Sequence, residues 1–151
     1  MPTTISDAIL HALAPGIALN SAIFYNSSLQ NRFLYITARA RDLNREARDL
    51  AKAEGDVTVR LASIRTQVDA MTKRARAVRR AVVIVYCALS SFILTILALL
   101  LQAVTRVPGG ELAALLLFAA GFVALATATL VSMGEMALSQ RTLDEDIRSS
   151  Y

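Results

Sequence analysis

Six polar residues lie inside apolar stretches of this 151-residue sequence, where each side chain needs a hydrogen-bonding partner. Three lie near the amino-terminal stretch, at positions 20–31, and three lie in a later stretch, at positions 91–102. Amide and hydroxyl groups in such places can bond across packed helices, or can face water and weakly hydrate an ion. They form a candidate pore lining or polar interface: Asn20, Ser27, Asn31, Ser91, Thr95 and Gln102.

No pattern in the sequence is typical of an enzyme. His11 is its one histidine and Cys87 its one cysteine, so one chain cannot assemble a histidine-based metal site. A glycine-rich phosphate loop and a CxxC motif are also absent from the sequence. We therefore expect no enzymatic activity, no metal site and no cofactor.

Composition is typical of a membrane protein. Hydrophobic residues make up 55% of the chain and the mean hydropathy is +0.48, which is too apolar for an ordinary soluble domain. Residues 81–105 and 112–133 are almost wholly apolar and long enough to cross a bilayer, and Pro108 and Gly109 between them favour a reversal. We expect both to be transmembrane helices.

Residues 8–29 form a third, more polar stretch of sufficient length. A cleaved signal peptide is the alternative interpretation. However, no lysine or arginine precedes the apolar part, and the stretch continues directly into a helical pattern. We expect it to be retained as the first transmembrane helix.

A helical pattern links the stretch at 8–29 to the one at 81–105. Apolar residues and alanines recur there at alternating spacings of four and three, in residues 29–50 and again in 57–85. This heptad spacing predicts coiled-coil helices, and Gly55 and Asp56 between them suit a helix end and a new helix start. An antiparallel hairpin would oppose these pairs: Leu29 with Val78, Leu43 with Ile64, and Ala47 with Leu61. We predict this hairpin, although a parallel coiled coil between chains would use the same pattern. The limbs should continue into the adjoining spans as two long helices, at about 7–53 and 56–105.

The charge distribution predicts the orientation. Thirteen of the sixteen Lys and Arg residues lie between the first two spans, none precedes the first span, and Arg106 alone lies between the second and third. The positive-inside rule then places the amino terminus outside, and the hairpin and carboxyl terminus in the cytoplasm. The expected divisions are an amino-terminal segment with the first span (1–29), a cytoplasmic hairpin (30–80), two further spans (81–133) and a cytoplasmic tail (134–151).

Charged residues near the spans suggest two contacts. Glu135, just after the third span, has the same expected depth as Arg32, Arg79 and Arg80, so an ion pair could tie the third helix to the base of the hairpin. Before the second span lies a basic collar with no acidic neighbour after Asp69, able to hold anionic lipid headgroups at about 1 kcal/mol each. The collar comprises Lys73, Arg74, Arg76, Arg79 and Arg80. It lacks interleaved aromatic residues that could stack bases, so we expect no nucleic-acid partner.

Two further patterns concern helix faces. On the first limb, arginines alternate with Asp42, Glu46 and Asp49, which indicates a solvated face of mixed charge. In the third span small residues recur every four positions and predict a close-packing face: Ala120, Ala124, Ala128 and Ser132.

Several short patterns carry a resemblance. They are residues 13–15 (Leu-Ala-Pro), Asn31-Arg32, the arginine-rich entry to the second span, and the positions Ile36, Arg39, Arg41, Leu43, Glu135, Leu138 and Leu143. Together they resemble an uncharacterised family of small bacterial three-span membrane proteins, known only as a domain of unknown function. The resemblance implies the bacterial inner membrane and the same topology, and implies no activity.

The sequence therefore predicts an all-α integral membrane protein with three transmembrane helices and a long cytoplasmic antiparallel coiled-coil hairpin. Three helices cannot easily enclose every polar residue, so we expect a homo-oligomer. We expect a small ion channel or pore. The alternative is a membrane-anchored scaffold or accessory subunit, whose hairpin recruits a cytoplasmic protein partner.

Overall fold

The computed structural model describes residues 5–51, 58–105 and 109–149, with side chains for 13–51, 58–105 and 109–134. Three helices account for nearly all of these residues: α1 (Ile5–Leu50), α2 (Thr58–Thr105) and α3 (Gly110–Ser149). The described part of the chain contains no strand, so the predicted all-α class is confirmed. The two predicted long helices are present as α1 and α2, whereas the reversal predicted at Gly55 and Asp56 lies outside the described residues.

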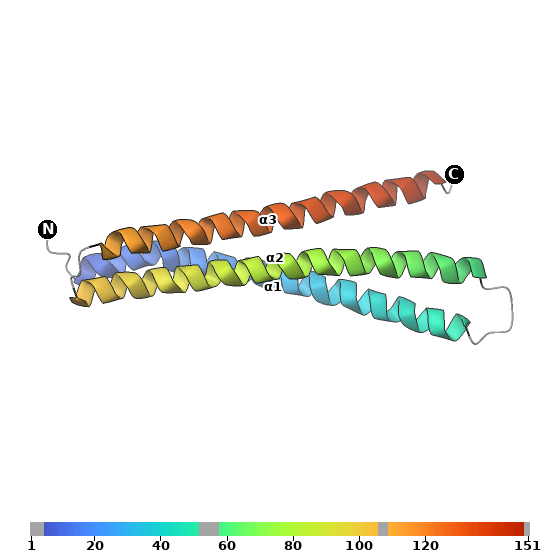
Figure 1. The fold of residues 1–151 in the computed structure, drawn as a ribbon, viewed down its shortest axis with the longest axis horizontal. Helices are drawn as coiled ribbons and strands as arrows, with labels where there is room; N and C mark the ends of the chain where they lie inside the picture. Colours follow the sequence, from blue (N-terminus) through green and yellow to red (C-terminus); the bar gives the residue numbers. More distant parts are fainter. Residues whose placement is uncertain (1–4, 52–57, 106–108, 150–151) are drawn as a thin grey trace.

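The three helices lie lengthwise along one another (Figure 1). α2 runs antiparallel to α1 and to α3 and packs against both. With 48 residues, α2 is about 72 Å long at ~1.5 Å per residue. All three helices are close together near the amino-terminal end of α1, while the carboxyl-terminal part of α3 diverges from the pair formed by α1 and α2.

The pairing of α1 with α2 follows the expected register. Leu29 and Val78 are both buried in one cluster, and Leu43 and Ile64 are also both buried. Further towards the end of the pair, an ion pair joins Glu46 to Arg60. The antiparallel pairing is thus present, and its supercoiling as a coiled coil stays a prediction.

The core forms where α2 meets both neighbours. One cluster combines Leu29 of α1, Val85 of α2 and Ala128 of α3. A second cluster joins Ala22 of α1 to Phe92 of α2, against which aromatic residues of α3 pack. The ring centroid of Phe92 lies 5.8 Å from that of Phe118 and 5.5 Å from that of Phe122, and the last two are 4.9 Å apart. Tilted and edge-to-face rings at these distances attract one another.

The predicted close-packing face of α3 is partly wrong. Ala128 and Ser132 are buried and Ala124 is half-buried, but Ala120 is exposed. The buried small residues in the described part of α3 are Ala114, Gly121, Ala128 and Ser132. The first three are seven positions apart, because a helix that stays against one partner over several turns repeats every seven residues. Gly121 is required at its place because a Cβ there would lie 2.5 Å from Cε1 of Phe92.

Two of the described helical segments are long and apolar enough to cross a membrane: α2, and residues 110–134 of α3. Only 22% and 17% of their most apolar windows is buried within the structure. A core helix of a soluble protein would be mostly buried, so these exposed apolar surfaces favour contact with lipid or with other subunits. The first span expected in residues 8–29 is not among these segments and stays a prediction.

We predict that Gly121→Ala destabilises the protein by about 1–3 kcal/mol, because the buried ring of Phe92 has little room to move away. Gly134→Ala is the matched control on the same helix. A Cβ at Gly134 would meet nothing within 4 Å, so this variant should unfold at or above the temperature of the unmodified protein. Thermal unfolding of the purified protein in detergent measures both. Equal unfolding temperatures for the two variants would contradict the close contact.

Candidate functional site

The six candidate polar residues separate into two groups. Asn20, Ser27 and Asn31 of α1 are exposed, on the side of the helix away from its buried residues. Ser91 and Gln102 of α2 are half-buried and Thr95 is buried. The structure therefore does not bring the six together. It directs the first group outwards and uses the second group inside the subunit.

The exposed group belongs to a longer pattern, which we call the outer seam. Its members recur at spacings of four and three, as the inner heptad residues do, but they face away from α2 and α3. The apolar members are 61%, 61% and 70% exposed, in the order Leu13, Ile17 and Phe24. The whole outer seam is Leu13, Ile17, Asn20, Phe24, Ser27 and Asn31. α1 thus carries one heptad face against α2 and a second, partly polar face that is exposed in the described part of the chain.

Of the three candidate polar residues of α2, Ser91 joins two helices. Ser91 Oγ donates a hydrogen bond to the backbone oxygen of Leu117 in α3 at 2.6 Å, and Thr95 Oγ1 donates to the backbone oxygen of Ser91 at 2.8 Å. Both hydroxyls are therefore satisfied within the subunit. Gln102 packs against Gly110 at the start of α3. A Cβ added to Gly110 would lie 3.0 Å from Oε1 of Gln102.

A cavity of about 350 Å³ lies between the three helices at this end of the bundle. Its walls are mostly apolar, and its polar lining comes from Thr95, Gln102 and Glu111. The cavity is consistent with loose packing beside Pro15, which also lines it. None of the exposed residues of the outer seam lines it, so the cavity and the outer seam are separate.

Polar contacts between α1 and α3 occur near the other end of the apolar segments, and the sequence did not indicate them. Tyr25 Oη donates to the backbone oxygen of Ala128 at 3.4 Å, and Arg32 Nη1 donates to Ser132 Oγ at 3.3 Å. Between these two lies Asn26, which is 8% exposed and whose Oδ1 has no hydrogen-bond partner in the described part of the chain. The spacing of Asn26, four after Ala22 and three before Leu29, could have shown that it faces inwards.

The predicted ion pair of Glu135 cannot be placed, because its side chain lies outside the described residues. Of its proposed partners, Arg32 reaches α3 through Ser132, while Arg79 and Arg80 are exposed on α2. Arg32 does bond to α3, at Ser132, and its ion pair with Glu135 stays a prediction.

The basic collar is mostly exposed. Lys73 Nζ lies 2.8 Å from Asp69 Oδ2, and this hydrogen bond and charge lower the pKa of the Asp69 carboxyl. Lys73, Arg76, Arg79 and Arg80 are exposed and Arg74 is half-buried. The arginines precede Ala81 by one or two turns, where a lipid surface would lie if α2 crosses a membrane.

Four arginines of the hairpin lie close together. Three arginines of α1 and one of α2 line a single groove of about 630 Å³, which we call the arginine groove. Its basic residues are Arg41, Arg45, Arg48 and Arg65, and its other lining residues are Asn44, Ala47, Ala51 and Leu61.

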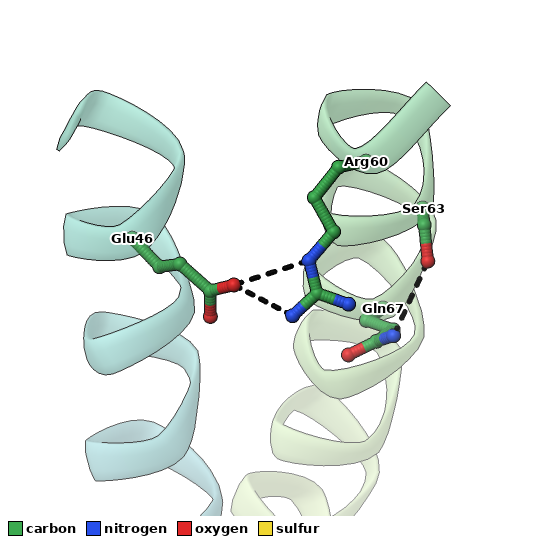
Figure 2. A network of polar contacts seen from close by, with 4 residues as sticks. All are labelled: Glu46, Arg60, Ser63 and Gln67. Atoms are coloured by element: carbon green, nitrogen blue, oxygen red, sulfur yellow. Dashed lines mark hydrogen bonds and ion pairs between the residues drawn. The ribbon is translucent and has the colours of Figure 1, made fainter. Parts of the chain in front are cut away.

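The acidic residues of α1 lie on its other flank. Figure 2 shows Arg60 of α2 reaching Glu46, to which its Nη2 and Nε both donate, at 2.6 and 3.2 Å. At 100° per residue, Asp42 and Asp49 fall on the same flank of α1 as Glu46. Asp42 also lies 3.9 Å from Arg45, with both side chains exposed, so charges of both signs meet on this limb, as the sequence indicated.

In the described residues no group of three His, Cys, Asp or Glu side chains is placed to hold a metal ion. The polar chemistry of the structure consists of amides, hydroxyls and arginines. Such groups can bind anions, hydrate ions weakly or join helices.

Comparisons with known proteins gave one match. A family model described as "Protein of unknown function (DUF2721)" matches residues 12–145. No curated protein and no solved structure matches the chain.

We predict that Ser91→Ala lowers the stability of the protein by about 1 kcal/mol, because it removes a hydrogen bond from α2 to α3 in an apolar setting. The neighbouring Ser90 is exposed, so Ser90→Ala should have almost no effect and serves as the control. Unfolding in detergent by chemical denaturant provides the comparison. The bond would be unimportant if the two alanine variants unfolded alike.

Proposed function

Because the chain belongs to the DUF2721 family, whose function is unknown, we propose a function from its own geometry: a homo-oligomeric membrane protein that forms a small ion pore. The observation that carries this proposal is the outer seam of α1. It places two asparagines and a serine on an exposed face of a helix that otherwise packs through apolar residues.

The membrane placement is part of the proposal. α2 and the first part of α3 supply two apolar segments, and the amino-terminal half of α1 lies beside them. We propose that all three cross the bilayer, with the hairpin of α1 and α2 in the cytoplasm and the amino terminus outside, as the thirteen basic residues favour. The family resemblance implies the bacterial inner membrane.

Polar groups facing hydrocarbon are unfavourable, so the outer seam needs protein or water beside it. Copies arranged about an axis would meet this need. The second-span group is a poor lining in comparison, because Thr95 is buried and Ser91 bonds to α3 of the same subunit. Asn20, Ser27 and Asn31 would then line the axis and hydrate a passing ion weakly, while the arginines at the cytoplasmic mouth favour anions.

A membrane-anchored scaffold is the second candidate. It is favoured by the length of the α1 and α2 pair, which continues beyond the apolar segments to the contact between Glu46 and Arg60. A pore alone does not require so long a projection, whereas a cytoplasmic protein partner could use it. The scaffold requires the outer seam to be a packed, dry contact between subunits.

We predict that the two ends of the bundle face opposite sides of the membrane. In a Cys87→Ser background, a cysteine introduced at Ala51 should resist an impermeant thiol reagent applied to intact cells, and one at Glu111 should react, because both positions are exposed in the structure. Permeabilised cells provide the control, in which both should react. Labelling of the Ala51 position from outside would reverse the proposed orientation.

We predict that Asn20→Leu or Ser27→Leu reduces ion flux by about tenfold, equivalent to a barrier increase of roughly 1.4 kcal/mol. Flux is measured with purified protein in liposomes. The matched control is Ser21→Leu, because Ser21 and Ser27 are both exposed and each donates to the backbone oxygen four residues earlier at 3.1 Å, but Ser21 is outside the outer seam.

If the ion flux fell equally in all three variants, the result would contradict the proposal that the outer seam lines the pore. An oligomer that conducts no ions, and whose behaviour the leucine variants leave unchanged, would favour the scaffold.

A further inference from the structure

The arginine groove is a concentrated positive surface, and the described structure places little negative charge against it. Arg45 Nη1 lies 3.9 Å from Asp42 Oδ1, with both side chains more than half exposed, and Arg48 Nε donates to the backbone oxygen of Asn44. An exposed pair at that distance contributes little attraction. Four guanidinium groups along an apolar floor, which includes Leu61, fit an acidic and partly apolar segment better than a single small anion.

The groove faces away from the α3 helix of its own subunit. Arg32 marks the side of α1 that meets α3, because it bonds to Ser132. An α-helix turns by about 100° per residue, so Arg41 points about 180° away from Arg32, and Arg45 and Arg48 lie within roughly 40° of that direction. The α3 helix of the same subunit is therefore on the wrong side of α1 to cover the groove.

The only dense acidic run outside the hairpin lies in α3 at the same level along the bundle. α1 and α3 run in the same direction, and their bonded residues differ in number by 103 and 100. Residues 144–146 of α3, which are Asp-Glu-Asp, thus lie level with residues 41–46 of α1. Leu143 and Ile147 flank this run and match the apolar floor of the groove in character.

We propose that the arginine groove of one subunit binds the acidic carboxyl-terminal part of α3, residues 143–147, from a second copy of the chain. Subunits that share one membrane have equal heights, so the acidic run of one copy lies level with the groove of the next. The carboxyl-terminal part of α3 diverges from its own α1 and α2, which leaves it available to a neighbour (Figure 1).

Such a contact joins two different surfaces, so it can repeat from subunit to subunit, and it forms a ring when the rotation between neighbours closes. This inference rests on the proposed homo-oligomer. It assigns the contact that would hold the cytoplasmic side of that oligomer together.

Two complementary variants of the full-length protein test the contact. The first is Arg45→Glu with Arg48→Glu, and the second is Asp144→Arg with Glu145→Arg. Each variant alone places like charges together and should raise the concentration needed for half-assembly by about tenfold, measured by native mass spectrometry or sedimentation in detergent. When the two variants are co-expressed and alternate, each altered groove meets an altered tail of opposite charge and each unmodified groove meets an unmodified tail. The mixture should therefore assemble at a lower concentration than either variant alone, and an even-numbered ring should recover the unmodified assembly.

Controls separate this contact from general electrostatic effects. Arg39→Glu reverses an exposed charge of α1 outside the groove. It should leave the concentration for half-assembly unchanged, and it should not restore assembly of the variant with the altered tail. Restoration by the mixture requires contact between chains, because a tail bound to its own groove would remain mismatched in both variants.

The outcomes distinguish the two proposals. An oligomer that persists unchanged in both variants would overturn the groove contact and leave the homo-oligomer standing. Weakened assembly without restoration in the mixture would also overturn it. A monomeric unmodified protein would overturn both.

Discussion

The structure depends on one continuous buried face of α2. From Val78 to Thr95 its buried residues follow one another at spacings of three and four, and Ile64 continues the same face towards the hairpin end. α1 and α3 both pack on this helix, so the residues that bury the hairpin and those that bury the apolar segments belong to a single seam. Because it has no break, the register set by Leu29 and Val78 also fixes which residues of the apolar segments meet.

Much of the architecture could be predicted from the sequence. The alternating spacings of apolar residues indicated two long helices and their antiparallel register, because the buried positions of a helix recur every three or four residues. The apolar lengths of α2 and α3 were equally clear. These features depend on local pattern and on composition, which one sequence contains in full.

Other features depend on which side chain of another helix packs against a given position. A spacing of four made Ala120 a plausible contact, but Gly121 is the residue that meets Phe92, and only the placement of that ring decides between them. Likewise, Asn20 and Ser91 are both polar residues in apolar stretches. Ser91 finds a backbone oxygen of α3, whereas Asn20 faces outwards, and nothing in their local sequences separates the two.

The absence of a break in α2 also has a mechanical consequence. A helix of 48 residues that is packed along most of its length behaves as a stiff rod, and α1 beside it has 46 residues. Bending such rods would separate packed side chains, so a sideways force at the hairpin tip is transmitted as a tilt of the whole pair. The contacts of Tyr25 and Arg32 with α3 lie between the two ends and act as a fulcrum. Ala18 and Ala22 pack against α2 on the other side of these contacts, so a tilt of the pair would also have to move Asn20.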